Sequence, residues 1–283
     1  MTDTTKTEII ALGTGAAFTM NNWQTNYIIS ITKDDKAQRL LVDCGTDIRF
    51  SLRDQGFSYL DIDALFVSHA HGDHAAGIDY IAFPTYFDGR YQARRLPTPD
   101  WKGPKIKPIL FAERQLMKDL WAHSWQGSLE GLEGVDATLD TYFDTRPIKV
   151  NDSFVFGGVK FDIVQSIHVS AKYALVNSFG LMFTDRGKRI YMTSDCQYAP
   201  ETSMKAYYSE ADIIVHDCET IHKPGVHAHY DDLRTLKPEV KAKMRLVHYQ
   251  DNVLDNWDEW QQKAHDDGFY GFVKPGVIYV TAQ

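Results

Sequence analysis

Four side chains that could bind a metal ion lie within six residues of one another. The stretch LFVSHAHGDHAAGID contains His69, His71, Asp73 and His74. Imidazole and carboxylate groups are the ligands that zinc and its first-row neighbours prefer. The apolar run before them predicts a buried strand and the spacing after them predicts a helix, so the ligands should occupy a strand-to-helix turn. We expect Gly72 to let the backbone curl, so that both ends of the motif face one point.

The spacing HxHxDH matches the signature of the metallo-β-lactamase superfamily. The chain resembles the ribonuclease Z-like and cyclic-nucleotide phosphodiesterase-like branch in the order of three features. These are an early strand ending in Gly-Thr-Gly, a later strand ending in Asp43-Cys44-Gly45, and then this motif. The resemblance covers nearly the whole chain and implies an α/β fold, the four-layer αβ/βα sandwich of that family. The sequence allows two roles for Asp43. Its carboxylate could brace the metal loop, or it could cap a helix expected from Thr46 to Gln55.

The resemblance further implies a centre of two divalent metal ions. Zinc is the ion we expect, with manganese or iron as alternatives. We expect every ligand to follow directly after a strand. The implied ligands are His69, His71 and His168 for one metal, Asp73, His74 and His248 for the other, and Asp195 as the bridge between them.

Two divalent ions that lie close together can share one hydroxide, because binding to a metal lowers the pKa of water from 15.7 to about 7. The expected reaction is hydrolysis of a phosphodiester by attack of this metal-bridging hydroxide. A histidine must then protonate the leaving alkoxide. His227 is the first candidate for that acid, because HAHYDDL resembles the turn of the family, with Asp217 to orient it and His229 as second candidate. The alternative for either histidine is a structural role, such as capping a helix.

The chain has 283 residues, of which 43% are hydrophobic, enough for a large core. It contains no linker, repeat or low-complexity run, so we expect a single domain over residues 1–283. The N-terminus lacks the features of a signal peptide and no apolar run could span a bilayer, which predicts a cytoplasmic protein without a membrane partner. Its cysteines, Cys44, Cys196 and Cys218, are odd in number and are expected to be reduced thiols.

An inserted arm is expected at about residues 84–107, where prolines and glycines exclude a continuous helix or central strand. From Asp88 to Lys107 this arm carries six positive and two negative side chains, a net charge of +4 in a chain whose net charge is -8. Arg90, Arg94 and Arg95 are its arginines. We consider two roles for the arm: a solvated loop or dimer contact, and a surface that docks an anion.

The substrate we expect is a small phosphodiester or nucleotide, such as a cyclic nucleotide. Because a polyanion is bound mainly by lysine and arginine, the net charge of -8 makes RNA a less favourable partner. Two other activities fit the same ligands: an endonuclease that processes RNA 3′ ends, and an acyl hydrolase acting on a lactone, thioester or β-lactam. A vestigial, non-catalytic site would have lost ligands, whereas all seven are present. A homodimer is implied by the resemblance.

Overall fold

Two mixed sheets of seven strands form the centre of the computed structural model, which describes residues 5–98, 101–171, 174–200, 204–223 and 225–281. In spatial order the first sheet contains β16 (Gly276–Val280), β1 (Lys6–Gly13), β2 (Asn26–Lys33), β3 (Lys36–Val42), β4 (Ala64–Val67), β5 (Ile109–Glu113) and β8 (Asp144–Ile148). The second sheet contains β15 (Gly271–Phe272), β14 (Met244–Val247), β13 (Ile213–Asp217), β12 (Lys188–Met192), β11 (Ala174–Asp185), β10 (Val159–Ala171) and β9 (Ser153–Phe156).

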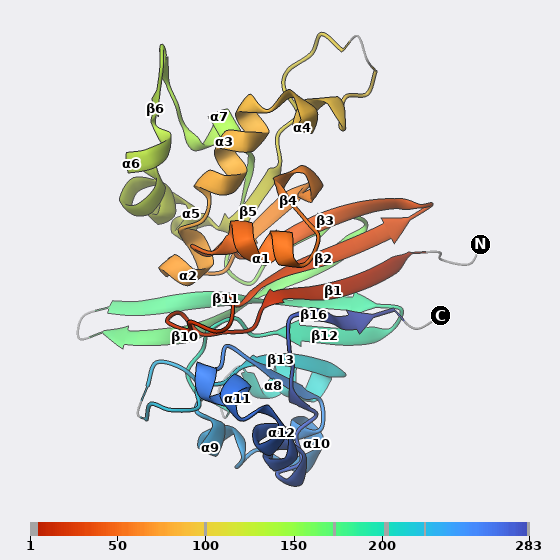
Figure 1. Cartoon of the computed structure of the whole chain (residues 1–283), viewed down its shortest axis with the longest axis vertical. Helices are drawn as coiled ribbons and strands as arrows, with labels where there is room; N and C mark the ends of the chain where they lie inside the picture. Colours follow the sequence, from red (N-terminus) through yellow and green to blue (C-terminus); the bar gives the residue numbers. More distant parts are fainter. Residues whose placement is uncertain (1–4, 99–100, 172–173, 201–203, 224, 282–283) are drawn as a thin grey trace.

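Helices cover the outer side of each sheet. The first half of the chain supplies α1 (Ile48–Asp54), η1 (Tyr59–Asp61), α2 (Gly72–Ala75), α3 (Asp79–Phe87), α4 (Gly89–Ala93), α5 (Arg114–Leu120), the π-helical turn Trp121–Trp125, α6 (Gln126–Leu129) and α7 (Leu139–Tyr142), beside the small strand pair β6 (Gly131–Leu132) and β7 (Val135–Asp136). The second half supplies α8 (Met204–Glu210), α9 (Tyr230–Leu233), α10 (Pro238–Lys241), α11 (Asp251–Asp255) and α12 (Trp257–Asp266). Figure 1 shows the first group above the paired sheets and the second group below them.

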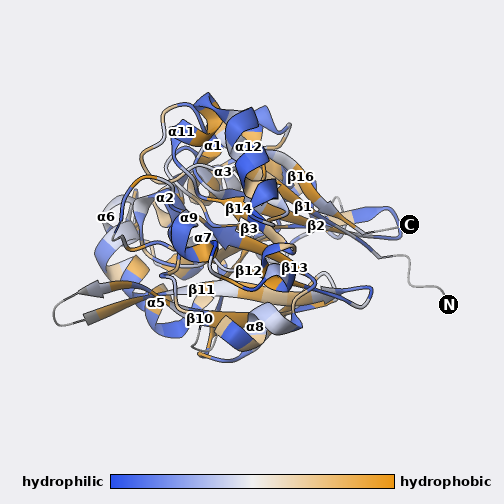
Figure 2. Cartoon of the chain, turned by 90° about the horizontal axis from the view of Figure 1, so that it is seen from below, coloured by the Kyte–Doolittle hydropathy of each residue, from blue (hydrophilic) through white to orange (hydrophobic). Residues whose placement is uncertain are grey.

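Buried apolar side chains fill three layers of this arrangement. One layer lies between the two sheets and includes Ile29 and Phe161. A second lies between the first sheet and its helices, and a third between the second sheet and its helices. Figure 2 shows hydrophobic and hydrophilic residues side by side on the helices, as expected when only one face of a helix meets a sheet. The predicted four-layer α/β sandwich is therefore confirmed.

Parallel pairing aligns the ends of two strands in the first sheet and of three strands in the second. In the first sheet β3 runs parallel to β4, and in the second sheet β12, β13 and β14 run parallel to one another. Neighbouring parallel strands end on the same side, and loops beyond those ends commonly hold ligands. The loops after β3, β4, β12, β13 and β14 are therefore placed to build one site.

The helix expected after the HxHxDH motif is broken into α2 and α3. The prediction for Gly72 is wrong, because its backbone does not adopt a positive φ and a Cβ there would meet only the Ala76 Cβ, at an ordinary 3.8 Å. The close approach occurs at Gly45 and Gly77 instead. A Cβ on Gly45 would lie 2.1 Å from the carbonyl oxygen of Asp73, and one on Gly77 would lie 2.0 Å from that of Gly45. These two glycines let the loop after β3 pack directly against the metal loop.

The segment predicted as an arm is partly helical, since it contains the end of α3 and all of α4. Two of its three arginines face carboxylates of the preceding segment. Arg94 lies 3.5 Å from Asp61, and Arg95 lies 2.7 Å from Asp63. Arg90 pairs with Asp88 at 2.6 Å. These partners match the arginine charges, which favours a structural role over the docking of an anion.

Arg95 is the arginine we expect to stabilise the fold. Its side chain is only 15% exposed, donates to Asp63 and to the carbonyl oxygens of Leu60 and Ile62, and covers the ring of Tyr91. Hydrogen bonds to a charged group contribute about 2 kcal/mol, so Arg95→Ala should lower the free energy of unfolding by about that amount in urea denaturation.

Arg94→Ala is the matched control, because the Arg94 side chain is 54% exposed and exposed ion pairs contribute about 0–1 kcal/mol. Equal effects of the two substitutions would contradict the structural role that we assign to Arg95.

Among the helices within the described ranges, none is both long and apolar enough to cross a membrane. That residues 1–283 form one domain stays a prediction.

Candidate metal centre

The HxHxDH motif occupies the turn between β4 and α2. His69 follows β4 after one residue, His71 is the N-cap residue of α2, and Asp73 and His74 belong to that helix. All are buried except His71, which is half-buried. The strand thus ends where the first histidine must point inward, and the short helix places the other ligands on the same side.

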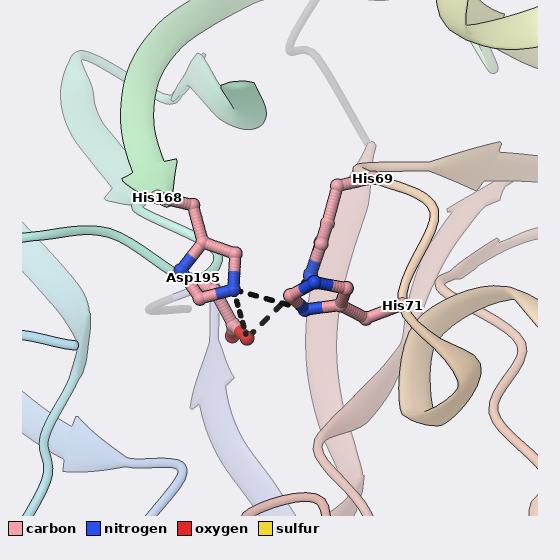
Figure 3. A group of neighbouring side chains, drawn as sticks. All are labelled: His69, His71, His168 and Asp195. Carbon is pink, nitrogen blue, oxygen red and sulfur yellow. Dashed lines mark hydrogen bonds and ion pairs between the residues drawn. The ribbon is translucent and has the colours of Figure 1, made fainter. Parts of the chain in front are cut away.

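The first group of side chains contains three histidines and one aspartate. Figure 3 shows the rings of His69, His71 and His168 converging on the carboxylate of Asp195. The ligand atoms of this group all lie within 4.8 Å of one another. Asp195 Oδ2 is 3.6 Å from Nε2 of both His69 and His168, and His168 Nε2 is 3.0 Å from His71 Nδ1. These are the residues that the resemblance implies for one metal.

The second group shares Asp195 with the first. It consists of Asp73, His74, Asp195 and His248, again with all ligand atoms within 4.8 Å. His74 Nε2 lies 3.2 Å from Asp73 Oδ2 and 3.3 Å from Asp195 Oδ2. His248 Nε2 lies 3.3 Å from Asp73 Oδ2 and 3.5 Å from Asp195 Oδ1. Asp195 therefore stands between the two groups, in the position expected of a bridging carboxylate.

These residues fit divalent metal ions. The Nε2 atoms of His69 and His74 and the Oδ2 atom of Asp195 are buried without a hydrogen-bond partner among the described residues. An unpaired buried polar atom costs about 1–3 kcal/mol, so three of them pointing at one region indicate a missing partner. Imidazole nitrogens and a carboxylate are the donor set that such ions take. The identity and number of the ions stay predictions.

The ionisation of the first group suits metal binding. Burial lowers the pKa of His69 well below its ordinary value and that of His168 to about 4, so both rings are neutral at pH 7. Burial alone would raise the pKa of Asp195, but His248 and His74 hold it well below its ordinary value. Neutral imidazole and ionised carboxylate are the forms that coordinate a metal.

His168 corrects the prediction that every ligand follows a strand. It lies inside β10, where pairing with β11 passes from Ile167↔Asn177 to Val169↔Val176 and leaves His168 without an opposite residue. Such a β-bulge re-aims a side chain, and here it turns the histidine into the site. The Nδ1 atom of His168 donates to the carbonyl oxygen of Val226 at 3.0 Å, which leaves Nε2 facing the other ligands.

Asp43 braces the metal loop, and the alternative helix-capping reading is wrong, because Asp47 is the N-cap residue of α1. The Asp43 carboxylate accepts the backbone amide and the hydroxyl of Ser68, each at 2.8 Å. It also accepts Nδ1–H of His74 at 2.7 Å. This contact fixes the His74 ring with Nε2 toward the site, as outer carboxylates do for metal-binding histidines.

Three residues at strand ends around the site have left-handed backbone conformations, which non-glycine residues rarely adopt. They are Asp43 (φ 66°), Ser194 (φ 55°) and His248 (φ 59°). Strain of this kind costs of order 1–3 kcal/mol per residue and is concentrated at functional sites. Here it turns the chain sharply at the ends of β3, β12 and β14, and no sequence pattern indicated it.

Each cysteine directly follows an aspartate of the site. Cys44, Cys196 and Cys218 are free, as predicted, and all are fully buried. They pack in the layers between the sheets and their helices. The Asp-Cys pairs therefore place a carboxylate in the site and a small apolar group in the core behind it.

His227 and Asp217 form a hydrogen-bonded pair beside the metal ligands. Asp217 ends β13, and its Oδ2 atom is 2.8 Å from His227 Nδ1 and accepts the backbone amide of Cys196 at 3.0 Å. The His227 ring lies 4.8 Å from that of His168 and 4.7 Å from that of His248, centre to centre. Burial opposes a charge on His227, but Asp217 outweighs it and raises the pKa of the ring. His227 can therefore carry a proton next to the ligand groups.

His229 occupies a different environment. It is the N-cap residue of α9, and its Nδ1 atom accepts the backbone amide of Asp231 at 3.1 Å. None of the three clusters of potential metal ligands among the described residues includes it. This capping contact assigns His229 a structural function, so His227 remains our candidate for the acid.

Glu219 is a site residue that our sequence analysis missed. Its carboxylate is buried, and its Oε1 atom accepts the backbone amides of Thr220, Ile221 and His222 at 2.7 to 3.1 Å. Its Oε2 atom accepts Gln250 Nε2 at 2.6 Å. An acidic residue two positions after the end of a buried strand was the available signal. Glu219 fixes the shape of the loop that leads to His227.

A cavity of about 460 Å³ opens beside His227 and His248. Three segments line it: the loop after β1, the loop after β13 and the start of α11. Cavities of about 300–1,000 Å³ are typical of small-molecule sites. The candidate metal centre is thus adjacent to a space large enough for an organic substrate.

Known proteins match the chain over almost its full length. The family profile described as Anti-Pycsar protein Apyc1 matches residues 7–279. The Anti-Pycsar protein Apyc1 of Paenibacillus harenae is 29% identical over 270 residues, which cover 95% of this chain and 97% of the relative. That of Bacillus phage vB_BveM-Goe7 is 28% identical over 265 residues, covering 89% and 92% of the two chains.

A solved structure, the metallo-β-lactamase fold protein YhfI from Bacillus subtilis, aligns with a TM-score of 0.68 and 18% identity over 98% of both chains. This confirms the predicted superfamily fold, whereas the branch within the superfamily stays a prediction. The family profile leaves only a few residues at each end unmatched. The protein therefore belongs to the Anti-Pycsar protein Apyc1 family.

Proposed function

We propose that the protein is a binuclear metal-dependent phosphodiesterase that hydrolyses a small phosphodiester such as a cyclic nucleotide. The observation that carries this proposal is the His227–Asp217 pair, which stands beside two ligand groups that share Asp195. Hydrolysis of a phosphodiester needs a nucleophile, charge neutralisation and a proton for the leaving group. Each requirement has a group of residues that meets it.

When bound, two divalent ions would supply a hydroxide at neutral pH and neutralise charge on the non-bridging phosphate oxygens. The residues of the chain account for the remaining step. With Nδ1 of His227 bonded to Asp217, Nε2 is the nitrogen available to a substrate. As the bond between phosphorus and the leaving oxygen breaks, His227 gives its Nε2 proton to that oxygen, and the neutral ring then regains a proton from water. Asp217 stabilises the charged form of the ring throughout.

A small substrate is supported by the position of the charges. Each arginine of the arm is paired with an aspartate, Arg94 and Arg95 with aspartates outside the arm and Arg90 with Asp88 inside it, which makes the arginines less available to a long polyanion. The cavity beside His227 is of the size that suits a nucleotide. Processing of RNA ends is therefore the less favoured activity, and a homodimer stays a prediction.

The proposal is tested by turnover on protein of defined metal content. The substrates are cyclic nucleotides, bis(p-nitrophenyl) phosphate, a lactone and a thioester. We expect hydrolysis of the two phosphodiesters and loss of activity after treatment with a chelator. Turnover of the lactone or thioester without hydrolysis of either phosphodiester would contradict the proposal.

A further inference from the structure

Phe18 is a large apolar side chain held in solvent at the wall of the cavity beside His227. It is 95% exposed, although it is itself one of the residues that line the cavity. The loop that carries it is anchored at both ends. Gly15 donates its amide to the carbonyl oxygen of Trp23 at 2.9 Å, and Ala16 donates to that of Tyr249 at 3.1 Å. The exposure of Phe18 is therefore built into an ordered loop.

A second set of contacts fixes this loop to the segment that follows His248. The carboxylate of Asp251, the first residue of α11, accepts the backbone amides of Met20 at 2.7 Å and Asn21 at 3.1 Å. Figure 1 shows the loop between β1 and β2, in red, against the blue C-terminal part of the chain. Phe18 is thus placed at a defined position relative to His248 and the rest of the site.

The opposite wall is equally well defined, because the Glu219 carboxylate holds the amides of the loop after β13. Ile221 and Val226 contribute apolar side chains to this wall. Asn252, near the start of α11, also lines the cavity. The cavity of about 460 Å³ is larger than a phosphate group requires. It has room for the organic group attached to the phosphodiester.

We infer that this cavity binds the base of a nucleotide substrate, and that Phe18 provides the surface on which the base stacks. Every nucleobase has a flat aromatic face, and stacking on an exposed aromatic side chain is a common way to bind a base whatever its identity. Because the cavity adjoins His227 and His248, a base bound there leaves its phosphate near the ligand groups. The inference rests on the proposed function for the position of that phosphate.

The test compares two substrates that differ only in the base: a 3′,5′-cyclic nucleotide and the cyclic ribose phosphate that lacks a base. Phe18→Ala should raise KM for the cyclic nucleotide by about 5- to 150-fold, the loss expected for one stacked base, with little change in kcat. KM for the cyclic ribose phosphate should not change. Phe18→Trp, which keeps an aromatic face, should retain the low KM.

Met20→Ala is the matched control. Met20 is on the same loop and is 88% exposed, but it does not line this cavity. It should leave KM unchanged for both substrates. Sedimentation of each variant separates base binding from subunit contact: a change in association in Phe18→Ala with the preference for the nucleotide intact would overturn the inference.

Equilibrium binding distinguishes failure of this inference from failure of the proposed function. A nucleoside 5′-monophosphate should bind the wild-type protein more tightly than ribose 5-phosphate in calorimetry, and Phe18→Ala should remove the difference. If the protein prefers the nucleoside 5′-monophosphate to ribose 5-phosphate but hydrolyses neither the cyclic nucleotide nor the cyclic ribose phosphate, only the proposed function fails. If the wild-type protein hydrolyses both and Phe18→Ala affects them equally, only the inference is overturned.

Discussion

Asp195→Ala should lower both metal content and phosphodiesterase activity, because its carboxylate adjoins both ligand groups. We expect the wild-type protein to carry close to two divalent ions per chain and the variant to carry fewer than one. Even outer residues that only support a ligand change metal affinity or activity by about 10- to 100-fold. Loss of the shared carboxylate should therefore reduce kcat by more than about 100-fold on every phosphodiester. Elemental analysis and steady-state kinetics measure the two effects.

Asp185→Asn is the matched control for this substitution. Asp185 is also a buried aspartate of the second sheet, but its carboxylate accepts hydroxyl groups of Thr7, Tyr279 and Thr281 and has no histidine partner among the described residues. It should lower stability without changing the number of ions per chain. A wild-type protein that saturates at one ion, with Asp195→Ala unaffected, would end the binuclear proposal.

Much of the fold could be predicted because its signals are local. The strand ending in Gly-Thr-Gly, the strand before Asp43 and the apolar run before the HxHxDH motif were predicted, and the structure confirms them as β1, β3 and β4. The ligands of the HxHxDH turn were accessible for the same reason, since four of them lie within six residues. Asp195 and His248 follow strand ends, which also leave a local pattern.

The features that could not be predicted depend on contacts between distant segments. His168 was placed after a strand because alternation continues through a β-bulge without a visible break. The need for glycine at Gly45 and Gly77 arises only when the loops after β3 and β4 pack together. The same is true of Asp43, whose two readings could be separated only by its contacts with Ser68 and His74. The charge of the arm was visible in the sequence, but its pairing with Asp61 and Asp63, which lie outside the arm, was not.

His227→Ala should separate acid catalysis from metal binding. The alkoxide of a sugar is a poor leaving group that needs a proton, whereas a nitrophenolate leaves without one. General acid catalysis contributes about 10²- to 10⁴-fold, so the variant should lose about that much kcat on a cyclic nucleotide and far less on bis(p-nitrophenyl) phosphate. Metal content should not change, because the two proposed ligand sets are complete without His227, although its ring also lies in a third cluster with Asp195, Asp217 and His248.

The choice of variants follows from the contacts of Asp217. This carboxylate touches His227 through Oδ2 and also lies 3.4 Å from Nδ1 of His248 through Oδ1. Asp217→Asn is therefore expected to disturb a metal ligand as well as the acid and to lower activity on both substrates. His227→Ala affects the acid alone, and His229→Ala, which removes only a helix cap, is its control. Equal losses on the two substrates in His227→Ala, or loss of metal, would show that His227 is not the acid, and a selective loss in His229→Ala would assign the role two residues later.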